Sequence, residues 1–105
     1  MNFRLILGWN VRRGRIALKL SQEKFAAAAE IADQPTVSEL ECGEGNPTFK
    51  TLEGAATALS ITVPQLFDVE GVPNEVISAA KGKTWSGDEI RALTAKYLKN
   101  KTTID

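Results

Sequence analysis

The chain has 105 residues, 43% of them apolar, and a formal net charge of zero, which together fit one globular domain with a short appended element and exclude a disordered or strongly basic protein. A single cysteine and the absence of histidine exclude an internal disulfide, zinc sites with histidine ligands and Ser/His/Asp catalysis. Because no stretch approaches the roughly 20 apolar residues of a membrane span and no signal-peptide pattern is present, we expect a cytoplasmic protein. Because no clustered nucleophile, base or metal ligands appear in the sequence, we expect no enzyme activity and no metal or cofactor.

The charge is distributed unevenly along the chain. Residues 1–20 contain five bases and no acid, residues 21–71 contain nine acids and two bases, and residues 72–105 contain six bases and four acids. Net charge therefore does not favour a nucleic-acid partner, and any affinity for DNA must come from the local placement of basic residues.

The first predicted helix runs from Phe3 to Leu18. Apolar residues recur on one side of it, at Leu7, Val11, Ile16 and Leu18. Arg12 and Arg13 flank this side. They are candidates for phosphate contact, and the alternative is that they only form a solvated helix face.

Two short helices follow, joined by a tight turn. Ser21 is a favourable N-cap for the first, Gln22 to about Glu30. Asp33 can cap the second, which stops at Gly43. This spacing is what a helix-turn-helix requires. Gln22 lies at a helix N-terminus, where its amide and the backbone N–H groups can meet a phosphate oxygen.

The second helix of this pair has an inward and an outward side. Val37 and Leu40 share the inward side, and Glu41 lies close to it. The outward side presents Pro35, Ser38, Glu39 and Cys42, flanked at its start by Gln34 and Thr36. We expect its N-terminal outward side chains to contact DNA bases, namely Gln34, Pro35, Thr36, Ser38 and Glu39.

Two further helices complete a compact all-α domain at residues 1–69. Thr48 caps the fourth helix, Phe49 to Leu59, and Lys50 near its start is a candidate for phosphate contact. The expected core face of this helix consists of Phe49, Leu52, Ala55, Ala56 and Leu59. Thr62 caps a short fifth helix, Val63 to Phe67.

Residues 70–105 read as a linker and C-terminal helices. A short helix is expected at 74–81, and Ser86 with Glu89 forms a capping box, with Trp85 and Ile90 as its hydrophobic staple. The helix that follows, from about Gly87 to Lys99, carries an apolar stripe at Ile90, Leu93, Tyr97 and Leu98. This stripe either packs on the first domain or forms a homodimer interface, and the pattern serves both purposes.

The motifs between residues 5 and 69 resemble the phage-repressor-like (XRE/Cro-type) helix-turn-helix family. The resemblance rests on the ordered series LSQ, V-S-x-L-E-x-G, N-P, T-L-x-x-A-x-A-L and a final L-F. It implies a five-helix lambda-repressor-like DNA-binding domain, bacterial or phage-encoded and nucleoid-associated, that usually acts as a dimer on palindromic operators. The C-terminal helical segment is additional.

The resemblance also implies roles for individual residues. In the family, the residue matching Gln22 binds phosphate, and those matching Gln34, Pro35 and Glu39 face bases. The residues matching Arg15 and Glu41 often form a structural ion pair.

This chain departs from the family pattern at the turn and on the outward side. The turn is one residue longer, Lys19 and Glu30 stand where glycine is common, and residues 44–46 lack basic side chains. Glu39 can accept a hydrogen bond from cytosine N4, but it must approach phosphates at a Coulombic cost.

Two functions fit these patterns. The main hypothesis is a sequence-specific transcriptional regulator that binds double-stranded DNA as a dimer, with the third helix in the major groove. The alternative, motivated by the acidic middle of the chain, is a helix-turn-helix fold used as a protein–protein interaction module with weak or no DNA binding.

Overall fold

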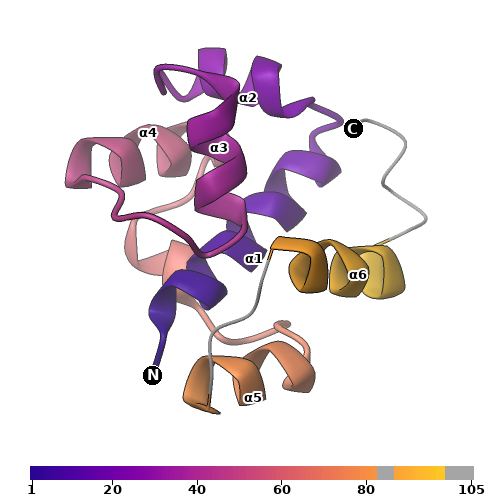
Figure 1. Cartoon of the computed structure of the whole chain (residues 1–105). Helices are drawn as coiled ribbons and strands as arrows, with labels where there is room; N and C mark the ends of the chain where they lie inside the picture. Colours follow the sequence, from indigo (N-terminus) through magenta and orange to yellow (C-terminus); the bar gives the residue numbers. More distant parts are fainter. Residues whose placement is uncertain (83–86, 99–105) are drawn as a thin grey trace.

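A computed structural model describes residues 1–82 and 87–98 (Figure 1). In these ranges the structure is helical, with no strand. The elements in chain order are α1 (Phe3–Ala17), α2 (Gln22–Ala28), α3 (Gln34–Glu41), α4 (Phe49–Leu59), the 3-10 helix η1 (Pro64–Phe67), α5 (Asn74–Gly82) and α6 (Gly87–Leu98). The all-α fold expected from the sequence is confirmed.

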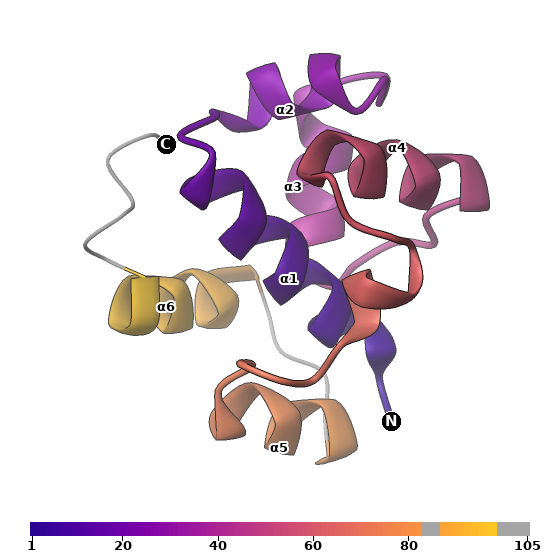
Figure 2. The same ribbon diagram turned by 180° about the vertical axis from the view of Figure 1, so that it is seen from behind.

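The main core lies where α1, α2, α3 and α4 meet, with η1 closing one end (Figure 2). Val37 and Leu40 are 0% and 3% exposed, so the inward side predicted for α3 is confirmed. Leu7 and Val11 of α1 face them from the same cluster. The slim alanine-rich α2 lets α4 approach closely, since a Cβ added at Gly54 would lie 2.1 Å from the carbonyl oxygen of Ala29.

A second core joins α5 to the other side of α1. Val72, Val76, Ala79 and Ala80 pack there against Leu5, Ile6 and Trp9. The backbone N–H of Asn2 also donates to the carbonyl of Ala80 at 2.6 Å. Helix α1 is therefore buried from two sides, which explains why ten of its residues are buried.

The helix N-caps follow the sequence rules. The side chains of Ser21, Asp33 and Thr48 each accept a hydrogen bond from the backbone N–H three residues later, at 3.1, 3.0 and 3.2 Å. At the start of η1, the backbone N–H of Thr62 donates to the side-chain oxygen of Gln65, and the backbone N–H of Gln65 donates to the hydroxyl of Thr62. The fifth helix is a 3-10 turn that begins at Pro64, one residue later than expected.

A residue with a left-handed backbone conformation follows each of the first four helices. Lys19, Glu30, Gly43 and Ser60 follow α1, α2, α3 and α4 with φ angles of 58°, 57°, 73° and 58°. After α2, the N–H of Ile31 bonds back to the carbonyl of Ala26 at 2.8 Å, which closes the helix end and buries Ile31. The lengthened turn thus keeps an ordinary helix stop although glycine is missing from it.

Two expectations about side chains are wrong, and two others lie outside the described residues and side chains. Phe49 is 65% exposed because it sits in the first turn of α4, beyond the core that Ala55 and Ala56 reach. Cys42 is 4% exposed rather than outward, because α3 has its C-cap there, against α1. The predicted capping box of Ser86 and the stripe at Ile90, Leu93, Tyr97 and Leu98 fall on residues or side chains that the structure does not describe.

Candidate nucleic-acid interface

A buried carboxylate, that of Glu41, connects α1, α2 and α3. Arg15 donates to it twice, from Nε to Oε2 at 2.6 Å and from Nη2 to Oε1 at 3.1 Å. Both side chains are completely buried. The structural ion pair implied by the family resemblance is therefore present in this structure, and its bidentate geometry satisfies charges that would otherwise be costly to bury.

Two further side chains reach the same carboxylate. Gln22 donates from Nε2 to Glu41 Oε1 at 3.0 Å, and Arg12 Nη1 lies 3.5 Å from that oxygen. We call Arg12, Arg15, Gln22 and Glu41 the Glu41 cluster. It joins the N-terminus of α2 to the C-terminal end of α3, and so fixes the angle between the two helices.

The cluster extends to the protein surface through two glutamines. Gln34 at the start of α3 donates from Nε2 to Oε1 of Gln22, which in turn donates to Glu41. Each amide has its orientation set by the next partner inward. A residue predicted to contact phosphate and a residue predicted to contact bases are thus held side by side at the N-termini of α2 and α3.

The start of α3 is ordered by its cap. The Asp33 carboxylate accepts from the backbone N–H of Thr36 at 3.0 Å and from its hydroxyl at 2.6 Å. Both hydrogen bonds lower the pKa of Asp33, and the bond from the Thr36 hydroxyl has a larger effect than the bond from its backbone N–H. The Thr36 hydroxyl is therefore engaged in the cap in this structure.

The outer surface of α3 is only partly open. Gln34, Pro35 and Glu39 are exposed, whereas Thr36 and Ser38 are half-buried. The carboxylate of Glu39 lies near Gly45 in the loop after α3. A Cβ added at Gly45 would be 3.2 Å from Oε2 of Glu39. These five residues share one stretch of helix, as the sequence predicted.

The loop between α3 and α4 is held by Arg4, a residue that no sequence motif indicated. Its Nη1 donates to the carbonyl of Gly45 at 2.9 Å, across 41 residues of sequence. No periodic pattern could have identified this contact, because it depends on how α1 packs under the loop.

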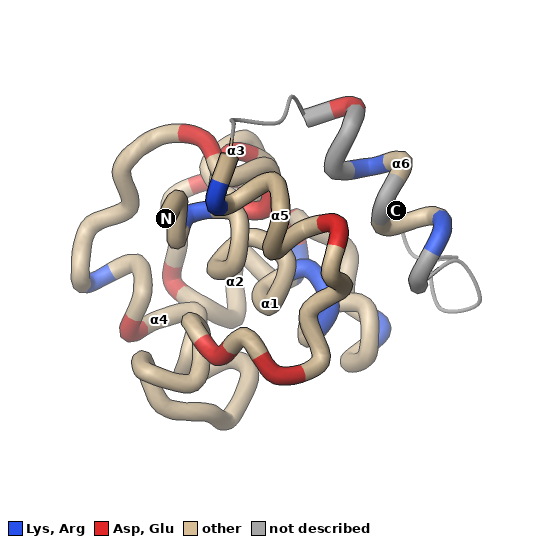
Figure 3. Tube along the Cα trace, turned by 90° about the horizontal axis from the view of Figure 1, so that it is seen from below, with Lys and Arg blue, Asp and Glu red and all other residues tan. Residues whose placement is uncertain are grey.

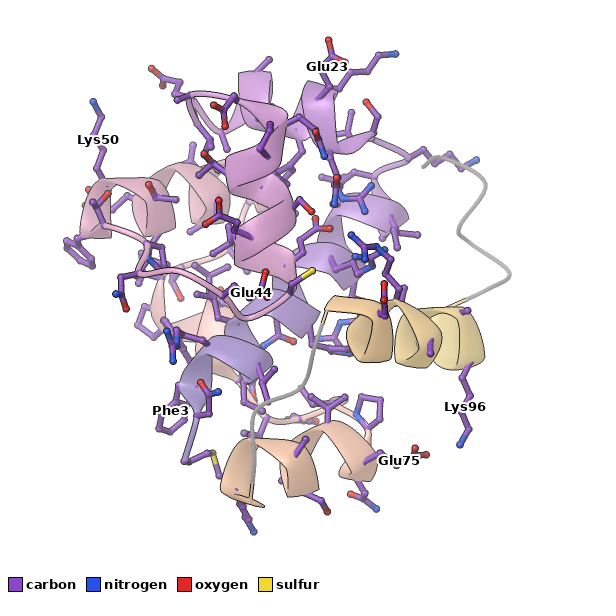
Figure 4. All side chains as sticks on the ribbon, viewed as in Figure 1. Phe3, Glu23, Glu44, Lys50, Glu75 and Lys96 are labelled. Atoms are coloured by element: carbon purple, nitrogen blue, oxygen red, sulfur yellow. The ribbon has the colours of Figure 1, made fainter. Side chains whose placement is uncertain are left out.

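The remaining phosphate candidates are not gathered in one place. Arg12 is 7% exposed within the Glu41 cluster. Arg13 donates to the carbonyl of Gly71 at 3.2 Å and to Asn10 Oδ1 at 2.8 Å, on the side of α1 that faces the chain after η1. Lys50 is exposed and extends from the start of α4 away from the body of the molecule (Figure 4). Of the predicted basic contacts, Lys50 is exposed, Arg13 is partly exposed and Arg12 is buried.

Acidic residues are interspersed with these bases. Figure 3 shows acidic positions distributed over several segments of the chain, and α6 carries both acidic and basic ones. Glu23, Glu39 and Glu44 are all exposed around α2 and α3. The surface around α2 and α3 is thus not uniformly basic, as the charge count of the sequence suggested.

Other kinds of site are not evident in the part of the chain that is described. There, no group of three or more cysteine, aspartate and glutamate side chains comes together to hold a metal ion. The same residues include no helix long and apolar enough to cross a membrane.

Comparison with known proteins identifies the family. The sequence model of the helix-turn-helix family matches residues 11–66, from the middle of α1 to η1. No curated protein and no solved structure matches the chain. The match covers more than half of the chain, so the protein belongs to the XRE/Cro-like helix-turn-helix family, a class of DNA-binding transcription regulators rather than enzymes.

Proposed function

We propose that this protein is a sequence-specific transcriptional regulator that binds double-stranded DNA with α3 in the major groove. The observation that carries the proposal is the chain of hydrogen bonds from Arg15 through Glu41 and Gln22 to Gln34. It holds an exposed amide in a fixed orientation at the N-terminus of the helix that the family uses for recognition. Preorganised polar groups of this kind are what direct readout of base edges needs.

The chemistry of Gln34 suggests which base it reads. One N–H of its amide is engaged with Gln22, which leaves the second N–H and the carbonyl oxygen for a ligand. A donor next to an acceptor matches N7 and N6 of adenine in the major groove. We therefore expect Gln34 to select adenine, while exposed Glu39 accepts from cytosine N4.

Phosphate contacts would flank these bases. The N-terminus of α2 with the amide of Gln22 forms one contact, and Lys50 at the start of α4 forms another. Residues 1–69 constitute the DNA-binding part, and residues 70–105 an accessory segment. A regulator of this kind acts on the nucleoid, in the cytoplasm.

The proposal includes a homodimer. Two copies that present α3 at half-sites about 34 Å apart, one turn of DNA, would read a palindromic operator and double the buried contact area. The dimer contact is assigned to the C-terminal segment, whose stripe at Ile90, Leu93, Tyr97 and Leu98 is amphipathic in sequence.

Selection from a random duplex pool, followed by sequencing, tests this function. We expect enrichment of a palindromic motif with half-sites about one helical turn apart. Enrichment of a single half-site would contradict the dimer, and no enrichment at all would contradict sequence-specific binding.

The second candidate is a protein-interaction module, favoured by the exposed acids Glu23, Glu39 and Glu44. A partner protein with a basic surface would bind α3 in place of DNA. Under this function the selection yields no motif, and random duplex DNA does not bind even at low salt.

A further inference from the structure

A cavity of about 330 Å³ lies between the second half of α1, the end of α4 and the chain around η1. Both α4 and η1 pack against α1 (Figure 2). Ala17 and Leu18 at the end of α1, with Leu59 and Ile61 at and after the end of α4, form an apolar wall. The volume is near the lower end of the roughly 300–1,000 Å³ that small-molecule sites occupy, so the cavity suits a ligand of amino-acid size.

Contacts within the protein fix the shape of this cavity. Buried Asn10 donates from Nδ2 to the carbonyls of Leu66 at 2.8 Å and Asp68 at 2.9 Å, which ties the chain after η1 to α1. On the opposite side, Leu59 lies directly over Gly14, since a Cβ added there would be 2.7 Å from Leu59 Cδ2. The walls therefore stand without a ligand, and binding requires little reorganisation of the protein.

Two residues of opposite charge, Arg13 and Asp68, line the cavity. Among the described residues, neither of them forms an ion pair. Arg13 uses two of its five N–H groups, in bonds to the carbonyl of Gly71 at 3.2 Å and to Asn10 Oδ1 at 2.8 Å. Within the same part of the chain, the Asp68 carboxylate accepts one hydrogen bond, from the backbone N–H of Glu70 at 2.9 Å. A positive and a negative group thus remain available to a ligand.

Gln65 adds a neutral donor to the lining. Its Oε1 accepts the backbone N–H of Thr62 at 2.8 Å, which sets the orientation of the amide. In the ranges that the structure describes, its Nε2 donates to no acceptor. The N–H groups of this amide can therefore join Arg13 in donating to an anionic oxygen.

We propose that this cavity binds a free amino acid with an apolar side chain. The ligand's carboxylate accepts hydrogen bonds from Arg13 and Gln65, and its ammonium donates to Asp68. Its side chain packs on Leu18, which is 49% exposed in the free protein, and on Leu59. A ligand with one charge would leave either Arg13 or Asp68 unmatched, whereas a zwitterion carries both charges close together. The cavity includes none of the residues proposed to contact DNA, so this inference goes beyond the proposed function and does not depend on it.

Titration of the full-length, ¹⁵N-labelled protein with L-leucine and L-phenylalanine, followed by NMR, tests the site. We expect saturable shift changes centred on residues 13–18, 59–61 and 65–68. For ligands of this size the dissociation constant should be about 0.1–1 mM. No saturable binding of either amino acid at about 20 mM, or shift changes centred elsewhere, would overturn the proposal.

Ligand analogues test which groups the cavity recognises. The compounds 4-methylpentanoate and 3-phenylpropanoate lack the ammonium, 3-methylbutylamine and phenethylamine lack the carboxylate, and glycine lacks the apolar side chain. Each should bind at least about fivefold more weakly than the amino acid it derives from, because one set of contacts is lost. Equal affinity of any of these analogues would contradict recognition of an apolar zwitterion.

Matched charge variants locate the binding site. Arg13→Gln and Asp68→Asn should each weaken binding of the amino acid at least about fivefold. Arg4→Gln is the control for the first, since Arg4 also donates from α1 to a loop carbonyl but does not line the cavity. Glu70→Gln is the control for the second and removes an exposed acid two residues away. Both controls should stay within about twofold of wild type, and equal weakening in a variant and its control would overturn the assignment.

A further pair of variants fills the cavity without changing charge. Ala17 is exposed at the wall, so Ala17→Phe occupies the space and removes no core contact. Saturable binding should be lost in this variant. Ala27→Phe makes the same change at an exposed position of α2 outside the cavity and should bind as wild type does. Because Ala17→Phe leaves the buried Asn10 contacts in place, it decides the matter even if a charge variant fails to fold, and unchanged binding by it would overturn the proposal.

Discussion

Glu41 is the residue on which the arrangement of the recognition helices depends. Its carboxylate is fully buried and is shared by Arg15, Gln22 and Arg12. A buried charge persists only where hydrogen bonds and an opposite charge replace its hydration. Since Gln22 in turn orients Gln34, a change at Glu41 would reach the surface of α3 through two hydrogen bonds.

Replacing this carboxylate is expected to destabilise the fold strongly. Glu41→Gln leaves the buried Arg15 guanidinium without a counter-charge, so we expect the free energy of unfolding to fall by about 3 kcal/mol or more. Urea denaturation measures this value. The matched control is Glu39→Gln on the exposed side of the same helix, which should change stability by no more than about 0.5 kcal/mol. Equal effects of the two substitutions would contradict the assigned role.

Gln34 carries the proposed base contact. Gln34→Ala should weaken binding to the selected operator by roughly 1–3 kcal/mol and relax preference at one base pair, because a bidentate contact to a base edge is lost. Gln65→Ala, the same substitution on η1, should leave both the affinity for the operator and the base preference unchanged. Binding assays against a set of single-base operator variants measure affinity and preference together, and an unaltered profile for Gln34→Ala would remove Gln34 as a reader.

Asp33 gives the helix start a dependence on pH. Its hydrogen bonds to Thr36 lower its pKa below 3.8, so the folded protein keeps the carboxylate charged where the unfolded chain takes up a proton. The resulting stabilisation is complete above the ordinary pKa and is lost as pH falls from about 4 toward the lowered value. Thermal unfolding between pH 2 and 6 should show this loss in wild type. Asp33→Ser, which keeps a capping oxygen without the charge, should show less of it.

The ends of the helices contain strain that can be removed. Lys19 and Glu30 adopt left-handed conformations with φ near 58°, which disfavour residues with a Cβ. Lys19→Gly and Glu30→Gly should each raise the free energy of unfolding by about 0.5–1 kcal/mol. Lys24→Gly, at an exposed position inside α2, should lower the free energy of unfolding by about 1 kcal/mol. Destabilisation by all three substitutions would show that no strain is present at the two stops.

The sequence predicted the helices well because their signals are local. Caps at Ser21, Asp33 and Thr48 and the periodicity of Val37 and Leu40 act within one or two turns. Side-chain environments were predicted less well, since they depend on tertiary packing. The burial of Cys42 and Arg12 reflects neighbours on other helices, and no pattern in α1 or α3 alone encodes it.

In the candidate site, too, features with local signals could be predicted and features that depend on tertiary packing could not. The residue types on the outer side of α3 could be identified from helical geometry, and the Arg15–Glu41 pair from the family resemblance. The hydrogen bond between Gln22 and Gln34 and the contact of Arg4 with Gly45 could not, because each joins side chains whose approach is set by the packing of separate elements.

At the scale of the whole molecule, α1 is the central element. One side of it packs in the core with α2, α3 and α4, and the other side packs with α5. The proposed recognition residues thus lie on helices that are anchored to α1, ten of whose residues are buried. This arrangement suits a protein that presents a fixed surface to DNA, although its overall charge is zero and its exposed acids oppose nonspecific attraction.

The most direct test of DNA binding is a salt titration of the full-length protein with duplex DNA. If lysine, arginine and helix N-termini neutralise phosphates, the logarithm of the binding constant falls linearly with the logarithm of salt concentration, with a slope of about −0.9 per phosphate contacted. We predict measurable binding at low salt and a slope that corresponds to several contacts. No binding to any duplex at low salt, or binding that does not change with salt, would contradict the DNA-binding function.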